Sequence, residues 1–307
     1  MIATGYAGSY DYTGTCVILM PSYQAKCFGG GCGLGGCDYY SGQSTTQMGD
    51  TRPAINFGTA GDGTAYTACS AGGFGNRATC FLLDPGGVIK CSGNNWWGQL
   101  GIEGTPDPAV NTPPGDGTYA SFSTIPPVNL GTGRYARALT MGQTTTCVIL
   151  DDNGVKCWGG GGTVDSLGTE DGLSHGGGWN GAHVARMGDS LPQVDLGTGV
   201  QAVRISAGED NNVCIVTAGS IPGGVKCWGT QSRGRLGPGS SRGATSGTMG
   251  DNNAALDLGL AGGESVVDIS CGYEHACALL STGNVKCWGG NQYGQLGLDD
   301  TNDRDQA

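Results

Sequence analysis

Residues 277–297 read CALLSTGNVKCWGGNQYGQLG, and most of the chain consists of diverged copies of this stretch. A short apolar run from Cys277 to Leu280 is followed by turn residues and then by a second run from Val285 to Trp288. Two such runs joined by a short turn predict a β-hairpin. In that hairpin Cys277 and Cys287 fall opposite each other, where Cα atoms lie about 4.5–5.5 Å apart, within the range of a disulfide. We therefore expect a cross-strand Cys277–Cys287 disulfide.

The cysteine pair recurs five times, at a period of about 65 residues. Each copy predicts the same disulfide-closed hairpin: Cys16 with Cys27, Cys80 with Cys91, Cys147 with Cys157, Cys214 with Cys227 and Cys277 with Cys287. After the second cysteine stands an aromatic residue (Phe28, Trp158, Trp228, Trp288), with Ser92 as the exception. A Leu-Gly pair then returns: Leu34-Gly35, Leu100-Gly101, Leu167-Gly168, Leu236-Gly237 and Leu296-Gly297. Because the tryptophans hold one position in the repeat, we expect them to pack between neighbouring copies.

A polar loop and a final alternating segment, such as Pro127-Val128-Asn129-Leu130-Gly131, separate one copy from the next. Alternation behind a proline predicts an exposed edge strand, which brings each repeat to about four strands. No segment has a helical period with caps. Tandem four-stranded units predict an all-β fold, a β-propeller of four-stranded antiparallel blades with five repeats visible. We place them in a single propeller domain, residues 1–307, at about 1–52, 53–126, 127–191, 192–254 and 255–307.

The ring is expected to be incomplete, or to be completed by flanking sequence. The first copy starts at Ile2, already at the end of its first strand, and the fifth stops at Ala307, inside the loop that leads to its last strand. A blade without its edge exposes unpaired backbone groups. Either flanking sequence supplies the missing strands or a neighbouring subunit associates at the seam, and the two alternatives can coexist.

Composition excludes several classes of protein. Glycine supplies 62 of the 307 residues without a collagen period, and only 13% of the residues are charged. The net charge of −11 at pH 7 argues against a phosphate-binding surface, so we expect no nucleic-acid partner. No apolar run approaches about 18 residues, so we expect no membrane span.

Fourteen cysteines, most of them closely paired, indicate an oxidising compartment. We therefore predict an extracellular or cell-surface location, although polar, glycine-rich sequence follows Met1 where a signal peptide would stand. The segments Thr112-Pro113-Pro114 and Thr124-Ile125-Pro126-Pro127 are candidate sites for O-linked glycan.

The phrase C-A-L-L-x-T-G-x-V-K-C-W-G-G-N-Q-Y-G-Q-L-G resembles the repeat of the regulator of chromosome condensation family, in its disulfide-bearing, secreted-type form. The resemblance covers essentially the whole chain. It implies four-stranded blades around a central axis, usually seven of them, where this sequence shows five.

The activities known for that family do not carry over residue by residue. Nucleotide exchange on a small nuclear GTPase needs a reducing compartment and a basic surface for chromatin, which the paired cysteines and the negative charge do not fit. Plant ultraviolet-B sensing resembles a mechanism built on a Gly-Trp-Arg-His-Thr motif that is absent here. A bacterial inhibitor that grips a β-lactamase with one propeller face offers the better analogy, a fold that serves as a binding surface.

Candidate sites for chemistry are few. His175 and His183, with Glu170, Asp171 and Asp189 nearby, are candidates for a metal site, but their spacing matches no zinc signature and a solvated loop is favoured. Asp299, Asp303 and Asp305 are weak calcium candidates in an acidic run that lacks the Gly and Glu of a hand-type loop. His275, at a strand entrance, is expected to make a structural hydrogen bond. No nucleophile elbow, phosphate loop or Ser-His-Asp order appears, so we expect no enzyme and no cofactor.

Three tryptophans and four cysteines fall outside the repeat pattern. Trp96, Trp97 and Trp179 are possible contact residues, because exposed aromatic residues often anchor partners. Cys32 and Cys37 flank a short glycine-rich loop and are expected to form a local disulfide. Cys69 and Cys271 are expected to be free or bonded to another chain, since four cysteines allow three connectivities.

Two functional classes remain open. The first is an extracellular structural or adhesive module that acts through contacts with copies of itself or with another extracellular protein, and that can assemble into a filament. The second is a soluble binding or inhibitory protein that uses one propeller face for a specific target. Rigid disulfides and the absence of catalytic motifs favour the first class.

Overall fold

The computed structural model describes residues 2–7, 12–19, 22–29, 54–60, 63–64, 67–71, 78–93, 95, 97–102, 122–123, 125–160, 164–176, 183–184, 186–238 and 246–305. Apart from three 3₁₀ turns, the regular structure in these residues is β-strand. No helix within these ranges has the length and apolar character needed to cross a membrane.

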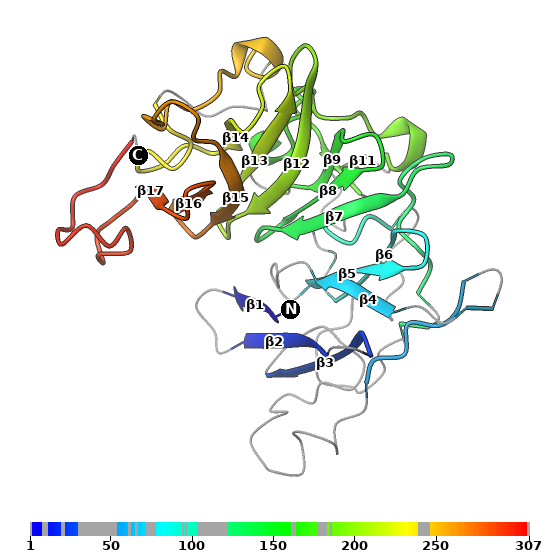
Figure 1. Ribbon diagram of the computed structural model, residues 1–307. Coiled ribbons are helices and arrows are strands. Elements are labelled where there is room, and N and C mark those ends of the chain that lie inside the picture. Colours follow the sequence, from blue (N-terminus) through cyan, green and yellow to red (C-terminus); the bar gives the residue numbers. More distant parts are fainter. Residues whose placement is uncertain are drawn as a thin grey trace.

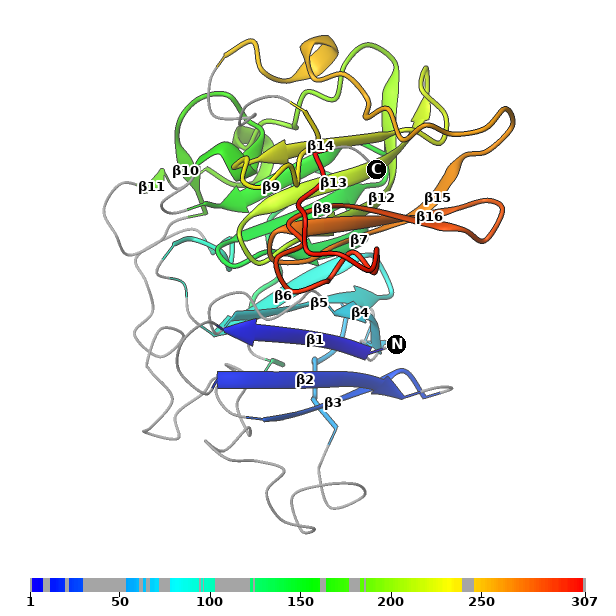
Figure 2. The ribbon, with the colours of Figure 1, turned by 90° about the vertical axis from the view of Figure 1, so that its left-hand side faces the viewer.

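The strands form five sheets in chain order, here called blades 1 to 5, which lie side by side (Figure 1, Figure 2). The three main strands of each sheet are antiparallel. Blade 1 consists of β1 (Ile2–Ala7), β2 (Tyr12–Leu19) and β3 (Gln24–Gly29); blade 2 of β4 (Thr67–Ala71), β5 (Ala78–Asp84) and β6 (Val88–Gly93); blade 3 of β7 (Ala136–Met141), β8 (Thr145–Leu150) and β9 (Val155–Gly159); blade 4 of β12 (Val200–Ala207), β13 (Asn212–Gly219) and β14 (Val225–Gly229); blade 5 of β15 (Val266–Cys271), β16 (His275–Leu280) and β17 (Val285–Gly289). Two short strands, β10 (Ser174–His175) and β11 (His183–Val184), extend blade 3, and the loops carry η3 (Val164–Leu167), η4 (Gly188–Ser190) and η5 (Gly250–Asn252).

In each blade, the second and third strands form the hairpin that the cysteine spacing predicts. The two cysteines face each other in register in all five hairpins. Disulfides join Cys80–Cys91, Cys147–Cys157, Cys214–Cys227 and Cys277–Cys287, with Cα atoms 4.0–4.2 Å apart. For Cys16 and Cys27 the structure describes the backbone pairing alone.

The fourth strand of each repeat is less regular than the alternating pattern predicts. It is an extended segment that donates one backbone hydrogen bond to the third strand of the blade before it, as from Val128 to Ile89, Val194 to Val155 and Leu256 to Val225. In the same segments an Asn or Asp side chain accepts the N–H of the glycine two residues on, as Asp195 does from Gly197. Because this local turn redirects the backbone, the segment does not continue as a strand ladder.

The hydrophobic core lies between successive blades. We call the side of a blade that carries its disulfide the forward face, and the opposite side the back face. The forward face of blade 3, with Ile149 and Val155 beside the disulfide, packs against Val213, Ile215 and Trp228 on the back face of blade 4. The same arrangement joins blade 2 to blade 3 and blade 4 to blade 5.

These contacts build an incompletely closed propeller, with blades 1 and 5 at its two ends (Figure 1). The all-β propeller predicted from the repeats is therefore confirmed. Blade 5 presents its forward face at one end of the array.

Candidate binding surface

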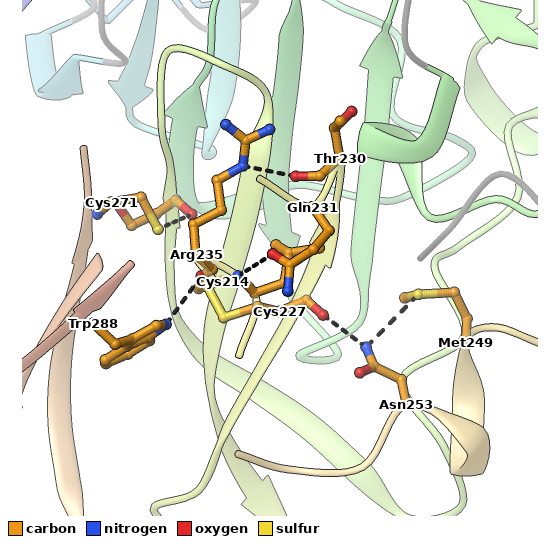
Figure 3. The surroundings of a disulfide bond; sticks show 11 residues. Cys214, Cys227, Thr230, Gln231, Arg235, Met249, Asn253, Cys271 and Trp288 are labelled. Carbon is orange, nitrogen blue, oxygen red and sulfur yellow. Dashed lines mark hydrogen bonds between the residues drawn. A yellow bond between two sulfur atoms is a disulfide. The ribbon is translucent and has the colours of Figure 1, made fainter. Parts of the chain in front are cut away.

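A tryptophan locks each of blades 3, 4 and 5 to the blade before it. The indole Nε1–H of Trp158 donates to the carbonyl of Gln99 at 3.1 Å, that of Trp228 to Ser166 at 3.1 Å, and that of Trp288 to Arg235 at 3.0 Å. Figure 3 shows the Trp288 contact beside the Cys214–Cys227 disulfide. The acceptor is always the residue before the Leu-Gly pair. The three indoles are fully buried, as expected for tryptophans that pack between blades.

A lysine that stands just before the second cysteine holds each blade internally. Lys156 Nζ donates to the carbonyls of Leu130 and Gly188 at 2.9 and 2.6 Å, and Lys226 Nζ to those of Leu196 and Gly250 at 2.7 and 3.0 Å. Burial lowers the pKa of Lys156, against an opposing effect of Asp189. Burial likewise lowers the pKa of Lys226. Each buried ammonium thus joins the extended fourth segment to the Met-Gly-Asp turn.

The forward face of blade 5 exposes residues that every other blade buries. On the disulfide face, the next cross-strand pair toward the hairpin turn is buried in blades 1 to 4. Its residues are at most 6% exposed: Ile18/Ala25, Leu82/Ile89, Ile149/Val155 and Val216/Val225. Their equivalents in blade 5, Leu279 and Val285, are 39% and 61% exposed. The Cys277–Cys287 disulfide on the same face is partly exposed, whereas the other three are buried. This open face is the candidate binding surface.

The described side chains considered as a metal site make separate contacts and do not form one cluster. His175 is fully buried, and its Nε2 lies 3.1 Å from a carboxylate oxygen of Asp171. Glu170 accepts the backbone N–H groups of Thr248 and Met249, both at 2.6 Å. Asp189 binds the hydroxyl of Thr132 at 2.6 Å, and the side chain of His183 is not described. Within the described ranges, no three His, Cys, Asp or Glu side chains gather as metal ligands would.

These contacts decide the charge states of two of those side chains. Burial lowers the pKa of His175, and the neighbouring Asp171 opposes that shift. Burial alone would raise the pKa of Glu170, but the hydrogen bonds from Met249 and Thr248 outweigh it and hold that pKa below its usual value. The Glu170 carboxylate therefore joins the loops of blades 3 and 4 through hydrogen bonds to its charged form.

The acidic run near the C-terminal end of the described chain is engaged in ion pairs. Asp303 lies 3.1 Å from Arg233 Nη1 and accepts the backbone N–H of Asn291. Asp300 lies 2.6 Å from Arg304 Nη2. The carboxylates of Asp299 and Asp305 join neither pair, so the three calcium candidates Asp299, Asp303 and Asp305 do not converge on one point in the described residues.

The remaining candidates have different outcomes. Trp97 is half-buried, and its backbone N–H donates to the Gln99 side chain, while Trp96 and Trp179 lie outside the described residues, as do Cys32, Cys37 and Thr112-Pro113-Pro114. Cys271 is a free thiol whose Sγ lies 3.4 Å from the Ser206 carbonyl, and burial raises its pKa to about 12. The side chain of Cys69 is not described. His275 is the first residue of β16, and burial lowers the pKa of its side chain.

Sequence reasoning missed the buried lysines, and it expected an open seam from unpaired strand edges without identifying the exposed apolar residues of blade 5. The lysines had a signal, because Lys26, Lys90, Lys156, Lys226 and Lys286 hold one position in all five copies. The exposure of Leu279 and Val285 had no signal, because these residues match the buried residues of the other copies in type and differ from them in surroundings alone.

The repeats are similar to those of known proteins. Residues 266–295 match the family model of the regulator of chromosome condensation (RCC1) repeat. The ultraviolet-B receptor UVR8 of Arabidopsis thaliana is 32% identical over 166 residues, which are 54% of this chain and 32% of the receptor. The human E3 ubiquitin-protein ligase HERC2 is 30% identical over 163 residues, 52% of this chain and 3% of the ligase. The chain thus spans about a third or less of the length of these relatives.

Solved propellers share the fold. Human WBSCR16 superposes with a TM-score of 0.64 at 17% identity, covering 99% of this chain and 65% of that one. Yeast RCC1 (Prp20), solved bound to Kap60, superposes with a TM-score of 0.61 at 17% identity, covering 96% of this chain and 58% of that one. A second structure of Prp20p, from Saccharomyces cerevisiae, has a TM-score of 0.61 at 16% identity, covering 96% of this chain and 60% of that one, and is described with its binding to Gsp1p and histones.

Proposed function

We propose that this chain, whose repeats resemble the regulator of chromosome condensation repeat and fold into a β-propeller, is an extracellular protein-binding module with a structural or adhesive role. The observation that carries the proposal is the open forward face of blade 5. Burying Leu279 and Val285 as their equivalents are buried would stabilise a complex by about 1.5–3 kcal/mol per fully exposed side chain, and by less here because both are already partly covered. An exposed apolar sheet face of this kind is typical of a contact surface.

The proposed extracellular location and the proposed protein-binding role each have separate support. Four disulfides, three of them buried, suit an oxidising compartment and hence an extracellular or cell-surface location. Yeast Prp20, which shares the fold, binds proteins, so the propeller is compatible with protein contacts. The proposal includes no catalytic activity and no cofactor. Self-assembly with further copies of this chain is one form of protein binding that the proposal includes.

Sedimentation velocity over a wide concentration range tests the proposal. We expect mass to rise with concentration in the native protein, and Val285→Lys to oppose that rise because it puts a charge into the contact. Val203→Lys is the matched control, since Val203 is 39% exposed on the first strand of blade 4, away from the open face. A monomer at every concentration that also captures no partner from its native source would contradict the proposal.

A second function, a monomeric protein that binds or inhibits one target, has a separate observation in its favour. A groove of about 330 Å³ runs between the hairpin turn of blade 2 and the start of β7. Leu82, Tyr135 and Arg137 are among the residues that line it, so it offers apolar, aromatic and cationic contacts together. A monomer whose target contacts protect this groove, and leave blade 5 accessible, would favour this function.

A further inference from the structure

The loop that receives a tryptophan has the same construction in blades 2, 4 and 5. In blade 2 the Leu100 N–H donates to the Asn95 side chain at 2.9 Å, and Gly101 N–H closes a turn onto Gly98 at 3.0 Å. In blade 4 the corresponding bonds are Leu236 to Gln231 at 3.0 Å and Gly237 to Gly234 at 2.8 Å. The loop is therefore shaped by its own hydrogen bonds before any indole enters.

In blades 2 and 3 the glycine of the Leu-Gly pair makes room for the incoming indole, whereas in blade 4 a Cβ atom on Gly237 would meet the side chain of Leu256. A Cβ atom on Gly101 would lie 2.7 Å from Nε1 of Trp158, and one on Gly168 would lie 3.1 Å from Nε1 of Trp228. Both glycines also have positive φ, near +65°. A side chain at this position would thus displace the ring that joins the two blades.

Blade 5 has the complete receiving loop and no ring in it. Leu296 N–H donates to the Asn291 side chain at 2.9 Å, and Gly297 N–H closes onto Gly294 at 3.0 Å, as in the other blades. Nothing in the described chain lies within 4 Å of a Cβ built on Gly297. No donor in the described residues bonds to the carbonyl of Gln295, the position whose equivalents accept the indole N–H of Trp158, Trp228 and Trp288.

We propose that Gln295, Leu296 and Gly297, together with Leu279 and Val285, form a tryptophan socket, and that its occupant is the β-hairpin of a further repeat of this kind with tryptophan after its second cysteine. This inference rests on the proposed binding function and names the partner of the same surface. The indole N–H would donate to the Gln295 carbonyl, and the hairpin's apolar back face would cover Leu279 and Val285. The contact continues the interface that already joins blades 2 to 5.

The sequence of this chain makes a second copy a weaker occupant than a blade with tryptophan. In a head-to-tail pair the incoming blade would be blade 1, which has Phe28 at the tryptophan position. A phenyl ring fills space in the socket but has no N–H for the Gln295 carbonyl. A buried carbonyl without a partner is costly, so a blade with tryptophan is the better match.

Direct titration with a hairpin probe tests the socket. The probe is a synthetic peptide of residues 212–229 with its Cys214–Cys227 disulfide closed, because that hairpin carries Val213, Ile215 and Trp228 on its back face, which is the face that the socket would receive. Isothermal titration calorimetry, with the peptide added to the whole 307-residue chain, measures the affinity of the peptide. Replacing Trp228 by Phe in the probe removes one hydrogen bond and should weaken binding about 3- to 10-fold, while Ala should weaken it further, by about 30-fold or more.

Matched variants of the chain locate the binding site. Gly297→Asn keeps the left-handed backbone that Asn tolerates and places a side chain where the indole would lie, so it should weaken probe binding at least about 10-fold. Gly133→Asn is the control, because Gly133 also has positive φ, also has nothing within 4 Å, and lies in blade 3. Equal binding to the native chain and Gly297→Asn, or equal affinity of the Trp and Ala probes, would overturn the proposal.

The outcomes also separate the socket from the broader proposed function. If the native chain assembles with concentration and Gly297→Asn leaves that assembly unchanged, the binding function stands and the socket is wrong. If Phe28→Ala abolishes the assembly and the tryptophan hairpin does not compete, a second copy is the occupant and the tryptophan assignment is wrong. If the hairpin binds through Gly297 while the chain stays monomeric, the socket stands and self-assembly is excluded.

Discussion

Replacing Lys226 by Met tests whether the buried lysine stabilises its blade. Lys226 is 2% exposed, and its Nζ donates to the carbonyls of Leu196 and Gly250 at 2.7 and 3.0 Å. Methionine keeps much of the apolar stem, so it tests the ammonium group. Hydrogen bonds from a charged donor each contribute about 1.5–3 kcal/mol, and the variant leaves both carbonyls without this donor. The ammonium's own desolvation, which also lowers the pKa of Lys226, offsets part of that loss.

We therefore expect Lys226→Met to lower the free energy of unfolding by about 2–4 kcal/mol. The matched control is Lys286→Met in blade 5, where the equivalent lysine is only partly buried and water replaces the lost donor. That change should cost about 1 kcal/mol or less. Urea unfolding with the disulfides intact, followed by tryptophan fluorescence, measures both. Equal destabilisation by the two variants would refute the reasoning, because burial is the difference between them.

Three further outcomes follow from the same contacts. The blade 5 disulfide should be reduced and alkylated before those of blades 2 to 4, which mass mapping after brief thiol treatment detects, since it alone among these four is partly exposed. Glu170→Gln should lower the free energy of unfolding by about 1 kcal/mol by weakening the charge-assisted bonds to Thr248 and Met249, whereas Glu264→Gln, on an exposed turn, should change it less. Stability should fall as the pH drops from about 7.5 to 5.5, because burial lowers the pKa of folded His175 below the unfolded value near 6.5 and the unfolded chain then binds more protons. The thermal midpoint of His175→Asn should lose part of that pH dependence, with the remainder due to buried His275; an unchanged dependence would contradict this assignment.

Local pattern predicted the part of the fold that depends on local geometry. A hairpin with cysteines ten residues apart, such as Cys277 and Cys287, places them opposite each other whatever surrounds it. The recurrence of Trp158, Trp228 and Trp288 likewise indicated packing between blades, because a position that repeats with the blade meets the same neighbour each time.

The sequence could not predict contacts that depend on the path of long loops. Lys226 reaches Leu196 and Gly250, which lie 30 and 24 residues away along the chain. Glu170 and His175 are five positions apart, yet one binds the loop of blade 4 and the other pairs with Asp171. Their closeness in sequence suggested a metal site because spacing alone does not report which way a loop turns.

The two faces of each blade differ in chemistry, and this difference gives the array a direction. In each contact from blade 2 to blade 5, a forward face with its disulfide and receiving loop meets a back face that carries an indole, and never another forward face. A two-fold symmetric dimer requires the same patch on both subunits. Contacts of the kind that join these blades are therefore heterologous. Any chain that adds at blade 5 in this manner must point the same way around the axis, and growth there ends where the rotation closes a ring.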